Sequence, residues 1–224
     1  MVIVWQYFKR KFKAYLRSKG YRIAQYTEIG LTPSLLSNYD IYKYFWEMTS
    51  DTTGDVADIG YGYGHSASIF LYLRETEIEP IPRNIYFFDS FKGFPEPSQF
   101  DSSPRNPIYG DFNYRSYKEA QKQCADFIGE NISDRFFIQG YIEETVPSFP
   151  KLQFSLINLD TDMYESHRIV LENFYPLLAV GGILIFDDYK SAKWPGATLA
   201  IENYFGNSVK QIRSYKGKHY IMKS

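Results

Sequence analysis

The sequence predicts an α/β protein built on one open, mostly parallel sheet with helices on both faces. Short apolar runs that suit buried strands alternate with segments of helical spacing between residues 55 and 205. Two of these runs, 154–159 and 182–186, are each followed by a pair of acids, and the segment between them is long enough for one helix. A strand, a crossover helix and a second parallel strand would bring both acid pairs to one edge of the sheet.

The first predicted elements follow from apolar spacing and from flanking turn residues. Gly20, Gly30 and Pro33 mark residues 20–37 as a connection. The elements expected next are a helix over 38–49 with Asn38 or Asp40 as its N-cap, a strand over 55–59, a helix over 66–75 and a strand over 84–88. Residues 92–115 are rich in Pro, Ser, Asp and Asn, and a loop of that length is usually functional or mobile.

The second half continues the alternation and ends in a hairpin. Pro195 suits the first turn of a helix, and Lys216-Gly217 between two apolar runs is a hairpin signal. The expected elements are helices over 116–128, 143–146 and 195–205, and strands over 135–138, 154–159, 182–186, 209–214 and 218–222. The hairpin makes the last strands antiparallel, which is the one departure from a parallel sheet.

Composition favours a soluble protein of one domain in a reducing compartment. The 224 residues are 44% hydrophobic and 23% charged, and Cys124 is the only cysteine, so an intramolecular disulfide is excluded. No apolar run reaches the about 20 residues of a membrane-spanning helix, and the first residues lack a signal-peptide pattern. We therefore expect a cytoplasmic protein.

The N-terminal segment is strongly basic. Residues 1–27 hold seven Lys or Arg and no acid, although the net charge of the chain is −1. One helical face collects apolar side chains, namely Trp5, Phe8, Phe12, Tyr15 and Leu16. This amphipathic helix can pack on its own domain, form a homodimer contact, or lie on an anionic membrane near a lipid-linked glycan. The remainder is acidic, which argues against nucleic acid as a partner.

A glycine-rich turn follows the first strand. Gly60, Gly62 and Gly64 let the backbone approach a ligand closely, as in a cradle for a nucleotide or for S-adenosylmethionine (SAM). A tight strand-to-helix turn without a ligand would also use glycine. His65 stands where a dinucleotide fingerprint has its third glycine, which favours SAM over NAD.

Two acids flank this turn. Asp89 ends the second strand, where an acid can accept hydrogen bonds from both ribose hydroxyls of a nucleoside. Asp58 precedes the turn and could meet a positive group such as the amino group of SAM. Both positions agree with a nucleoside-binding sheet edge.

Four aspartates follow the two apolar runs of the crossover unit: Asp160, Asp162, Asp187 and Asp188. Carboxylates crowded at one edge repel one another unless a cation or a proton lies among them, and Mg²⁺ prefers such hard oxygen ligands. A methyl acceptor hydroxyl would need both a metal and a base. Helix caps or a solvated acidic edge remain open as alternatives. His167 is expected on a helix surface rather than as a ligand.

Five stretches of the chain resemble the macrocin-type (TylF-type) O-methyltransferases, a family of SAM- and magnesium-dependent enzymes that methylate sugars and natural products. They are GDVADIGYGYGHSAS, FDSFKGFPEP, FIQGYIEETVP, INLDTDMYES and GGILIFDDYKSAKWPGATLAIENYF. The resemblance implies a class I SAM methyltransferase (Rossmann-like) domain over 51–224, with a seven-stranded sheet whose last strand is antiparallel. Residues 1–50 would form N-terminal helices before it.

The resemblance also implies roles for named residues. The metal ligands would be Asp160, Asp187 and Asp188, and the catalytic base would be Asp162. The expected cofactor-binding residues are Asp58, Gly60, Tyr61, Gly62, Gly64, Ser66, Asp89, Ser90, Phe91, Gly140, Tyr141 and Asp160. Tyr164, Tyr189 and Trp194 are expected to contact substrate. The family usually has glutamate where this chain has Asp58.

The sequence therefore predicts an O-methyltransferase that acts on a sugar hydroxyl of a glycan, a glycosylated metabolite or a nucleotide sugar. A magnesium-dependent enzyme for catechols or phenols is the alternative within the same class. A non-catalytic member that binds SAM or a glycan is the alternative from another class, and an NAD-linked oxidoreductase is the weakest. Four crowded carboxylates argue against a site that has lost its activity.

Overall fold

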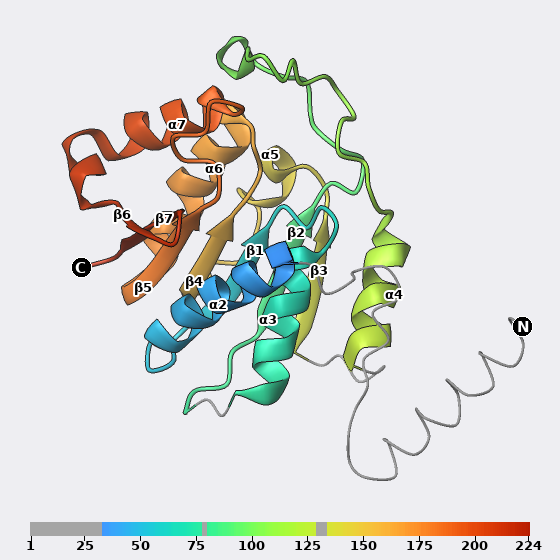
Figure 1. Cartoon of the computed structure of the whole chain (residues 1–224), viewed down its shortest axis with the longest axis vertical. Coiled ribbons are helices and arrows are strands. Elements are labelled where there is room, and N and C mark those ends of the chain that lie inside the picture. Colours follow the sequence, from blue (N-terminus) through green and yellow to red (C-terminus); the bar gives the residue numbers. More distant parts are fainter. Residues whose placement is uncertain (1–32, 78–79, 129–133) are drawn as a thin grey trace, which may run out of the picture.

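A computed structural model of the chain describes residues 33–77, 80–128 and 134–224. Within these ranges seven strands form one sheet in the order β3-β2-β1-β4-β5-β7-β6 (Figure 1). The pairs among β1 to β5 are parallel, whereas β7 runs antiparallel to both β5 and β6. The strands are β1 (Asp55–Ile59), β2 (Ile85–Asp89), β3 (Arg135–Gln139), β4 (Phe154–Leu159), β5 (Leu178–Phe186), β6 (Arg213–Tyr215) and β7 (Lys218–Met222). This confirms the predicted sheet, including its antiparallel end.

Helices cover both faces of the sheet (Figure 1). Those that pack on one face are α2 (Pro33–Met48), α3 (His65–Thr76) and α4 (Tyr117–Ile128), and those on the other are α5 (Ile142–Thr145), α6 (Tyr164–Phe174) and α7 (Pro195–Phe205). Short 3₁₀ helices are η1 (Gln99–Asp101), η2 (Tyr175–Leu177) and η3 (Gly206–Gln211). No helix in the described part of the chain has the length and hydropathy needed to cross a lipid bilayer.

The strands are apolar throughout because both of their faces are covered. In β1, Val56 belongs to the core beneath α2 and α3, while its neighbour Ala57 belongs to the core beneath α6 and α7. In β4, likewise, Leu156 belongs to the core beneath α2 and α3, and its neighbour Ile157 belongs to the core beneath α6 and α7. Successive side chains of a strand point to opposite faces, so a central parallel strand needs a continuous apolar run. Each large side chain buried this way contributes about 1.5–3 kcal/mol.

The strand order sets the position of the site. The chain crosses from β1 to β2 and β3 on one side and then returns to β4 on the other. Ligands of such sheets bind outside the carboxyl ends of the strands, where the winding direction reverses. The glycine turn follows β1, and the two acid pairs follow β4 and β5. The three motifs found in the sequence therefore share one edge of the sheet.

The start of α2 corrects one prediction. Residues 33–37 were expected to be connection, but α2 begins at Pro33, so neither Asn38 nor Asp40 is its N-cap. Proline breaks a helix interior but suits its first turn, because its missing N–H has no helical partner there. Ile41, Phe45 and Trp46 of α2 are buried in the core of the sheet. The predicted basic helix lies outside the described residues.

The strand expected over 209–214 is also corrected. Residues 206–211 form η3, and β6 covers only Arg213–Tyr215. Val209 and Ile212 both pack on the core, and a spacing of three positions suits a 3₁₀ turn better than a strand. The other differences are small, except that β5 begins at Leu178 rather than at 182. The bounds of β4 and α7 are as predicted.

Candidate functional site

A cavity of about 790 Å³ opens at the carboxyl ends of β1, β4 and β5. Its walls come from the glycine turn, the end of β2, the loop before α4, the four aspartates and Lys218 of β7. This volume is within the range of small-molecule sites. One cavity thus contains both the glycine turn and the four aspartates that the sequence predicted to lie at one edge of the sheet.

The glycine turn lies against the strand beside it. Gly60 has φ 98°, and a Cβ at this position would be 1.8 Å from the carbonyl oxygen of Asp160. Only glycine can therefore bring the ends of β1 and β4 this close. The Gly60 amide donates to the carbonyl of Phe88 at 2.9 Å. The turn leaves its backbone open to the cavity beside the acids.

Asp89 is oriented by backbone amides. Its Oδ2 accepts from the Gly62 N–H at 3.0 Å and its Oδ1 accepts from the Phe91 N–H at 2.6 Å. Burial raises the pKa of Asp89, and these two amides oppose that shift. A carboxylate has about four acceptor sites, so Asp89 can also accept from a ligand hydroxyl. Asp89 lines the cavity next to the glycine turn.

Asp58 lies beneath the cavity rather than in its wall. It is fully buried, and it accepts from Ser66 Oγ at 2.9 Å and from Asn158 Nδ2 at 2.8 Å. Burial raises its pKa to about 7, and the two hydrogen bonds limit the rise. Tyr42 of α2 donates to Asn158 Oδ1 at 3.4 Å, so the lead-in helix joins this network.

The other expected cofactor residues divide into two groups. Gly60, Tyr61, Gly62, Ser66, Asp89, Ser90, Tyr141 and Asp160 line the cavity, whereas Asp58, Gly64, Phe91 and Gly140 do not. Two residues of the second group, Gly64 and Phe91, lie against the ring of Tyr61, which lines the cavity. Phe91 packs on Tyr61, with ring centroids 5.8 Å apart, and a Cβ at Gly64 would be 2.8 Å from the ring of Tyr61.

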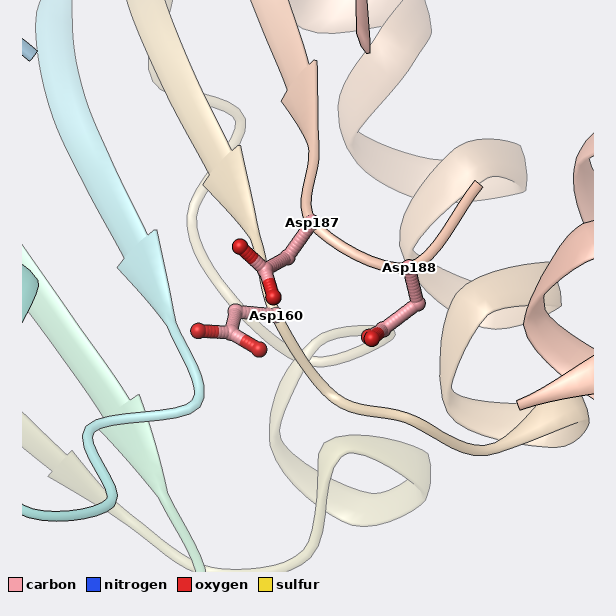
Figure 2. A group of neighbouring side chains, drawn as sticks. All are labelled: Asp160, Asp187 and Asp188. Carbon is pink, nitrogen blue, oxygen red and sulfur yellow. The ribbon is translucent and has the colours of Figure 1, made fainter. Parts of the chain in front are cut away.

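Three aspartates form a compact group at the ends of β4 and β5 (Figure 2). Asp160, Asp187 and Asp188 each offer one carboxylate oxygen, and these oxygens lie within 4.8 Å of one another. Asp188 is buried, and its Oδ2 has no hydrogen-bond partner among the described residues. Three hard oxygen donors, one of them unsatisfied, could hold a cation such as Mg²⁺, which prefers oxygen ligands.

Asp162 stands beside this group in an unusual backbone conformation. It has φ 62°, and its carboxyl group lies close enough to that of Asp188 for the two to interact electrostatically. Burial and the charge of Asp160 raise the pKa of Asp162; burial and the charge of Asp162 raise that of Asp188. A side chain in the left-handed region costs of order 1–3 kcal/mol, a strain found mainly at functional sites.

The helix-cap alternative does not hold for Asp162. The N-cap of α6 is Met163, which makes no side-chain cap. Instead the Tyr164 N–H donates to Oδ1 of Asp101 at 2.8 Å, so the loop before α4 caps this helix from a distance. Asp162 is therefore free to face the cavity, which it lines.

Lys218 is the residue that sequence reasoning missed. It lines the cavity, and its ammonium forms an ion pair with Asp187. Burial lowers the pKa of Lys218, while Asp160 and Asp58 oppose the shift. In the register of the sheet, His219 pairs with Phe186, which places Lys218 level with Asp187. A lysine beside a hairpin turn gives no local signal of this role.

His167 corrects a further expectation. It is fully buried in α6 rather than on its surface, and its Nδ1 lies 3.0 Å from Thr161 Oγ1 and 3.1 Å from the Met163 carbonyl. A carbonyl can only accept, so Nδ1 carries the proton. Burial lowers the pKa of His167 to about 4, which keeps the ring neutral. The ring thus braces the segment that holds Asp162.

Of the three expected substrate contacts, only Trp194 lines the cavity. Its ring meets those of Phe94 and Phe112, with centroids 5.6 and 5.8 Å apart. Tyr164 packs against Phe100 at 4.4 Å instead. Tyr189 is buried next to Phe186 and His219. The structure therefore places Trp194 in the cavity wall, and neither tyrosine lines that cavity.

Asp101 fixes the long loop to the site, and its loss should be costly. It is buried and accepts from Ser98 N–H, Ser98 Oγ and Tyr164 N–H. We expect Asp101→Ala to lower the free energy of unfolding by about 1.5–3 kcal/mol, as for lost hydrogen bonds to a charged group. Urea denaturation would measure this, and hydrogen exchange should show faster opening at the start of α6.

Asp111→Ala in the same loop is the matched control. Asp111 is partly exposed; it accepts from the Ile108 N–H at 3.2 Å and pairs with Arg105 at 3.6 Å, an ion pair worth about 0–1 kcal/mol. Equal losses in the two variants would contradict a special role for Asp101.

Comparison with known proteins gives a consistent result. The model of the macrocin-O-methyltransferase (TylF) family matches residues 47–213. The chain is 31% identical over 145 residues to the 8-demethyl-8-(2,3-dimethoxy-alpha-L-rhamnosyl)-tetracenomycin-C 4'-O-methyltransferase of Streptomyces olivaceus, across 63% of this chain and 55% of that protein. It is 30% identical to the mycinamicin III 3''-O-methyltransferase of Micromonospora griseorubida, across 61% and 55%. The aligned part thus spans about half the length of these curated relatives.

A solved structure agrees with this match. The calicheamicin methyltransferase CalS11 superposes with a TM-score of 0.75 at 26% identity, covering 86% of this chain and 80% of that one. Its apo form, named a TDP-rhamnose 3'-O-methyltransferase, gives a TM-score of 0.64 at 25% identity, with coverages of 86% and 81%. Together with the strand order β3-β2-β1-β4-β5-β7-β6, this superposition identifies the fold as that of a class I SAM-dependent methyltransferase.

Proposed function

Because this chain belongs to the macrocin-O-methyltransferase (TylF) family, we propose that it transfers a methyl group from SAM to a hydroxyl of a sugar, with Mg²⁺ as the metal. The observation that carries the proposal is the single cavity that joins the glycine turn to three convergent carboxylates. The donor would lie on the turn, and the acceptor oxygen would lie over the carboxylates.

The donor end would be formed by the turn and by Asp89. Gly60 and Gly62 would lie against the cofactor, and the carboxylate of Asp89 would accept from the ribose hydroxyls. Ser90 and Tyr141 line the same side of the cavity and would enclose the nucleoside. Asp58 would act through Ser66, which lines the cavity and donates to it.

The acceptor end would be formed by the acids and Trp194. Asp160, Asp187 and Asp188 would hold the metal, which would make the acceptor hydroxyl a stronger acid. The carboxylate of Asp162 would take the hydroxyl proton as the new oxygen–carbon bond forms and the carbon–sulfur bond of the donor breaks. S-adenosylhomocysteine and the methyl ether would be the products. The rings of Trp194, Phe94 and Phe112 would pack on the apolar face of the sugar.

The names of similar proteins support a proposal for the class of acceptor. The name of one relative specifies a rhamnosyl compound as its substrate, and CalS11 is named for TDP-rhamnose. We therefore propose a sugar hydroxyl of a glycoside or of a nucleotide sugar. Incubating the protein with labelled SAM and a panel of rhamnosides, TDP-rhamnose and catechol would test this. Methylation of catechol alone would favour the phenol alternative.

Binding of the donor can be tested without an acceptor. We expect Asp89→Asn to weaken SAM and S-adenosylhomocysteine binding about 10- to 100-fold in isothermal titration, because hydrogen bonds to a charged group are worth about 1.5–3 kcal/mol. Asp55→Asn is the matched control, since Asp55 holds Asn84 at the opposite end of the same two strands. Equal effects of the two variants would remove Asp89 from the donor site. No binding by the wild-type protein would overturn the SAM assignment.

A further inference from the structure

We infer that Lys218 is a built-in counter-cation of the carboxylate cluster, which holds the metal-free cluster together and weakens its affinity for the divalent ion. The second half of this inference rests on the proposed function, since it takes the cluster to be a metal site. The first half concerns the chain by itself. It goes beyond the roles that the sequence motifs assign, because the motifs contain no lysine of β7.

The position of Lys218 is set by sheet pairing. Strand β7 runs antiparallel to β5, and Lys218 extends one residue past the pair that joins His219 to Phe186. Its ammonium therefore reaches Asp187, the first residue after β5, and the two form an ion pair. The side chain of Lys218 is only 17% exposed, and that of Asp187 is 25% exposed. This is a partly dehydrated pair inside the cavity, not a surface contact.

The surroundings of the ammonium are acidic on several sides. Asp160 and Asp58 also interact electrostatically with Lys218, and the ring of Tyr42 is 6.0 Å from its Nζ. Removing an ammonium from water is costly unless opposite charges compensate. Here the compensating charges include Asp160 and Asp187, which are also the proposed metal ligands. The acids of the site therefore stabilise the charge of Lys218 in this partly buried position.

One lysine cannot neutralise this cluster. Lys218 pairs with Asp187 and Arg105 of the long loop acts on Asp162, while Asp188 Oδ2 has no hydrogen-bond partner in the described part of the chain. The cluster therefore keeps a place for a divalent ion on the side of Asp188. An ammonium next to that place repels the incoming ion and competes for Asp187. Both effects weaken metal binding.

Replacing Lys218 by methionine tests its effect on metal affinity and its effect on the stability of the metal-free protein in two separate measurements. The methionine keeps most of the apolar stem and removes the charge. We expect Lys218→Met to bind Mg²⁺ about tenfold or more tightly than the wild type in isothermal titration, since a nearby like charge is removed from a partly dehydrated site. In EDTA its Tm should fall below that of the wild type, and adding Mg²⁺ should raise its Tm by more than it raises the wild-type Tm. Lys218→Arg keeps the charge and should stay close to the wild type in both measurements.

Lys216→Met is the matched control. Lys216 belongs to the same hairpin, is 51% exposed and lies 3.7 Å from Asp40. Its loss should change neither Mg²⁺ affinity nor the Tm in EDTA. Mg²⁺ affinity in Lys218→Met that equals or falls below the wild-type value would overturn the metal half of the inference. An EDTA Tm equal to that of Lys216→Met would overturn the counter-cation half.

Two further outcomes remain informative. If neither the wild type nor any variant binds Mg²⁺, the metal assignment of the proposed function fails, and the EDTA measurement still decides the counter-cation role. If Lys218→Met does not fold, the double variant Asp187→Asn/Lys218→Met should fold better, because both members of the pair are neutral. A double variant no more stable than Lys218→Met would overturn the inference.

Discussion

Asp162→Asn is expected to lower kcat by about 10²- to 10⁴-fold, the usual contribution of a general base, with SAM affinity unchanged. The two side chains have the same shape, so the cavity and the left-handed backbone at this position are preserved. Only the ability to take a proton is lost. Burial and the charge of Asp160 raise the pKa of Asp162 towards the working pH, which suits a base.

The measurement needs an acceptor from the panel described above. Steady-state kcat and KM with that acceptor, together with SAM titration, would separate chemistry from binding. The wild-type rate should rise with pH as Asp162 ionises and then level off. Glu165→Gln is a matched control, because Glu165 pairs with Arg168 at 2.8 Å and does not line the main cavity. Full turnover by Asp162→Asn would remove it as the base.

Removing a carboxylate from the group of Asp160, Asp187 and Asp188 is expected to have the second large effect on turnover. We expect Asp160→Asn, Asp187→Asn or chelation by EDTA to lower turnover by about 10³-fold or more, since a bound metal supplies several kcal/mol of charge stabilisation. In calorimetric titration the two variants should bind Mg²⁺ weakly. Asp134→Asn, which removes an acid paired with Arg74 away from the cavity, should bind Mg²⁺ as the wild type does. Activity that survives EDTA would contradict a metal role.

The pH dependence of metal binding gives a further check on this group. Burial raises the pKa of Asp160 and of Asp188, so protons compete with the metal for these carboxylates. Mg²⁺ must displace them, and its affinity should therefore increase as the pH rises. Titrations in two buffers of different ionisation enthalpy would show the released protons as a difference in apparent heat. Equal affinity across neutral and alkaline pH would mean that no proton is displaced.

Much of the fold could be predicted because its signals are local. A central parallel strand must be apolar on both faces, so β4 appears in the sequence as an uninterrupted run with the correct bounds. The proline at the start of α7 marks that helix in the same way. The predictions that were wrong concern short stretches whose residues suit two kinds of local structure. Pro33 was interpreted as part of a connection although it begins α2, and Val209 and Ile212 satisfy a 3₁₀ turn as well as a strand.

The grouping of the acids could also be predicted without a structure. Asp160 follows β4 and Asp187 follows β5, and parallel neighbouring strands end at the same edge. The glycine turn after β1 belongs to that edge for the same reason. By itself, then, the sequence determined the sheet, the edge that bears the site and the acids gathered there. Each of these depends only on strand order and on the residues that follow each strand.

Only the tertiary structure decided what surrounds the acids. Lys218 reaches Asp187 because β7 pairs with β5 in one register, and Asp101 caps α6 from a loop 63 positions away. His167 is buried because the segment that holds Asp162 folds over it. Hydrophobic spacing shows which face of an element is covered, but not which distant side chain meets it there. The partners of a charged group depend on such distant contacts, and they determine its pKa and its affinity for ions.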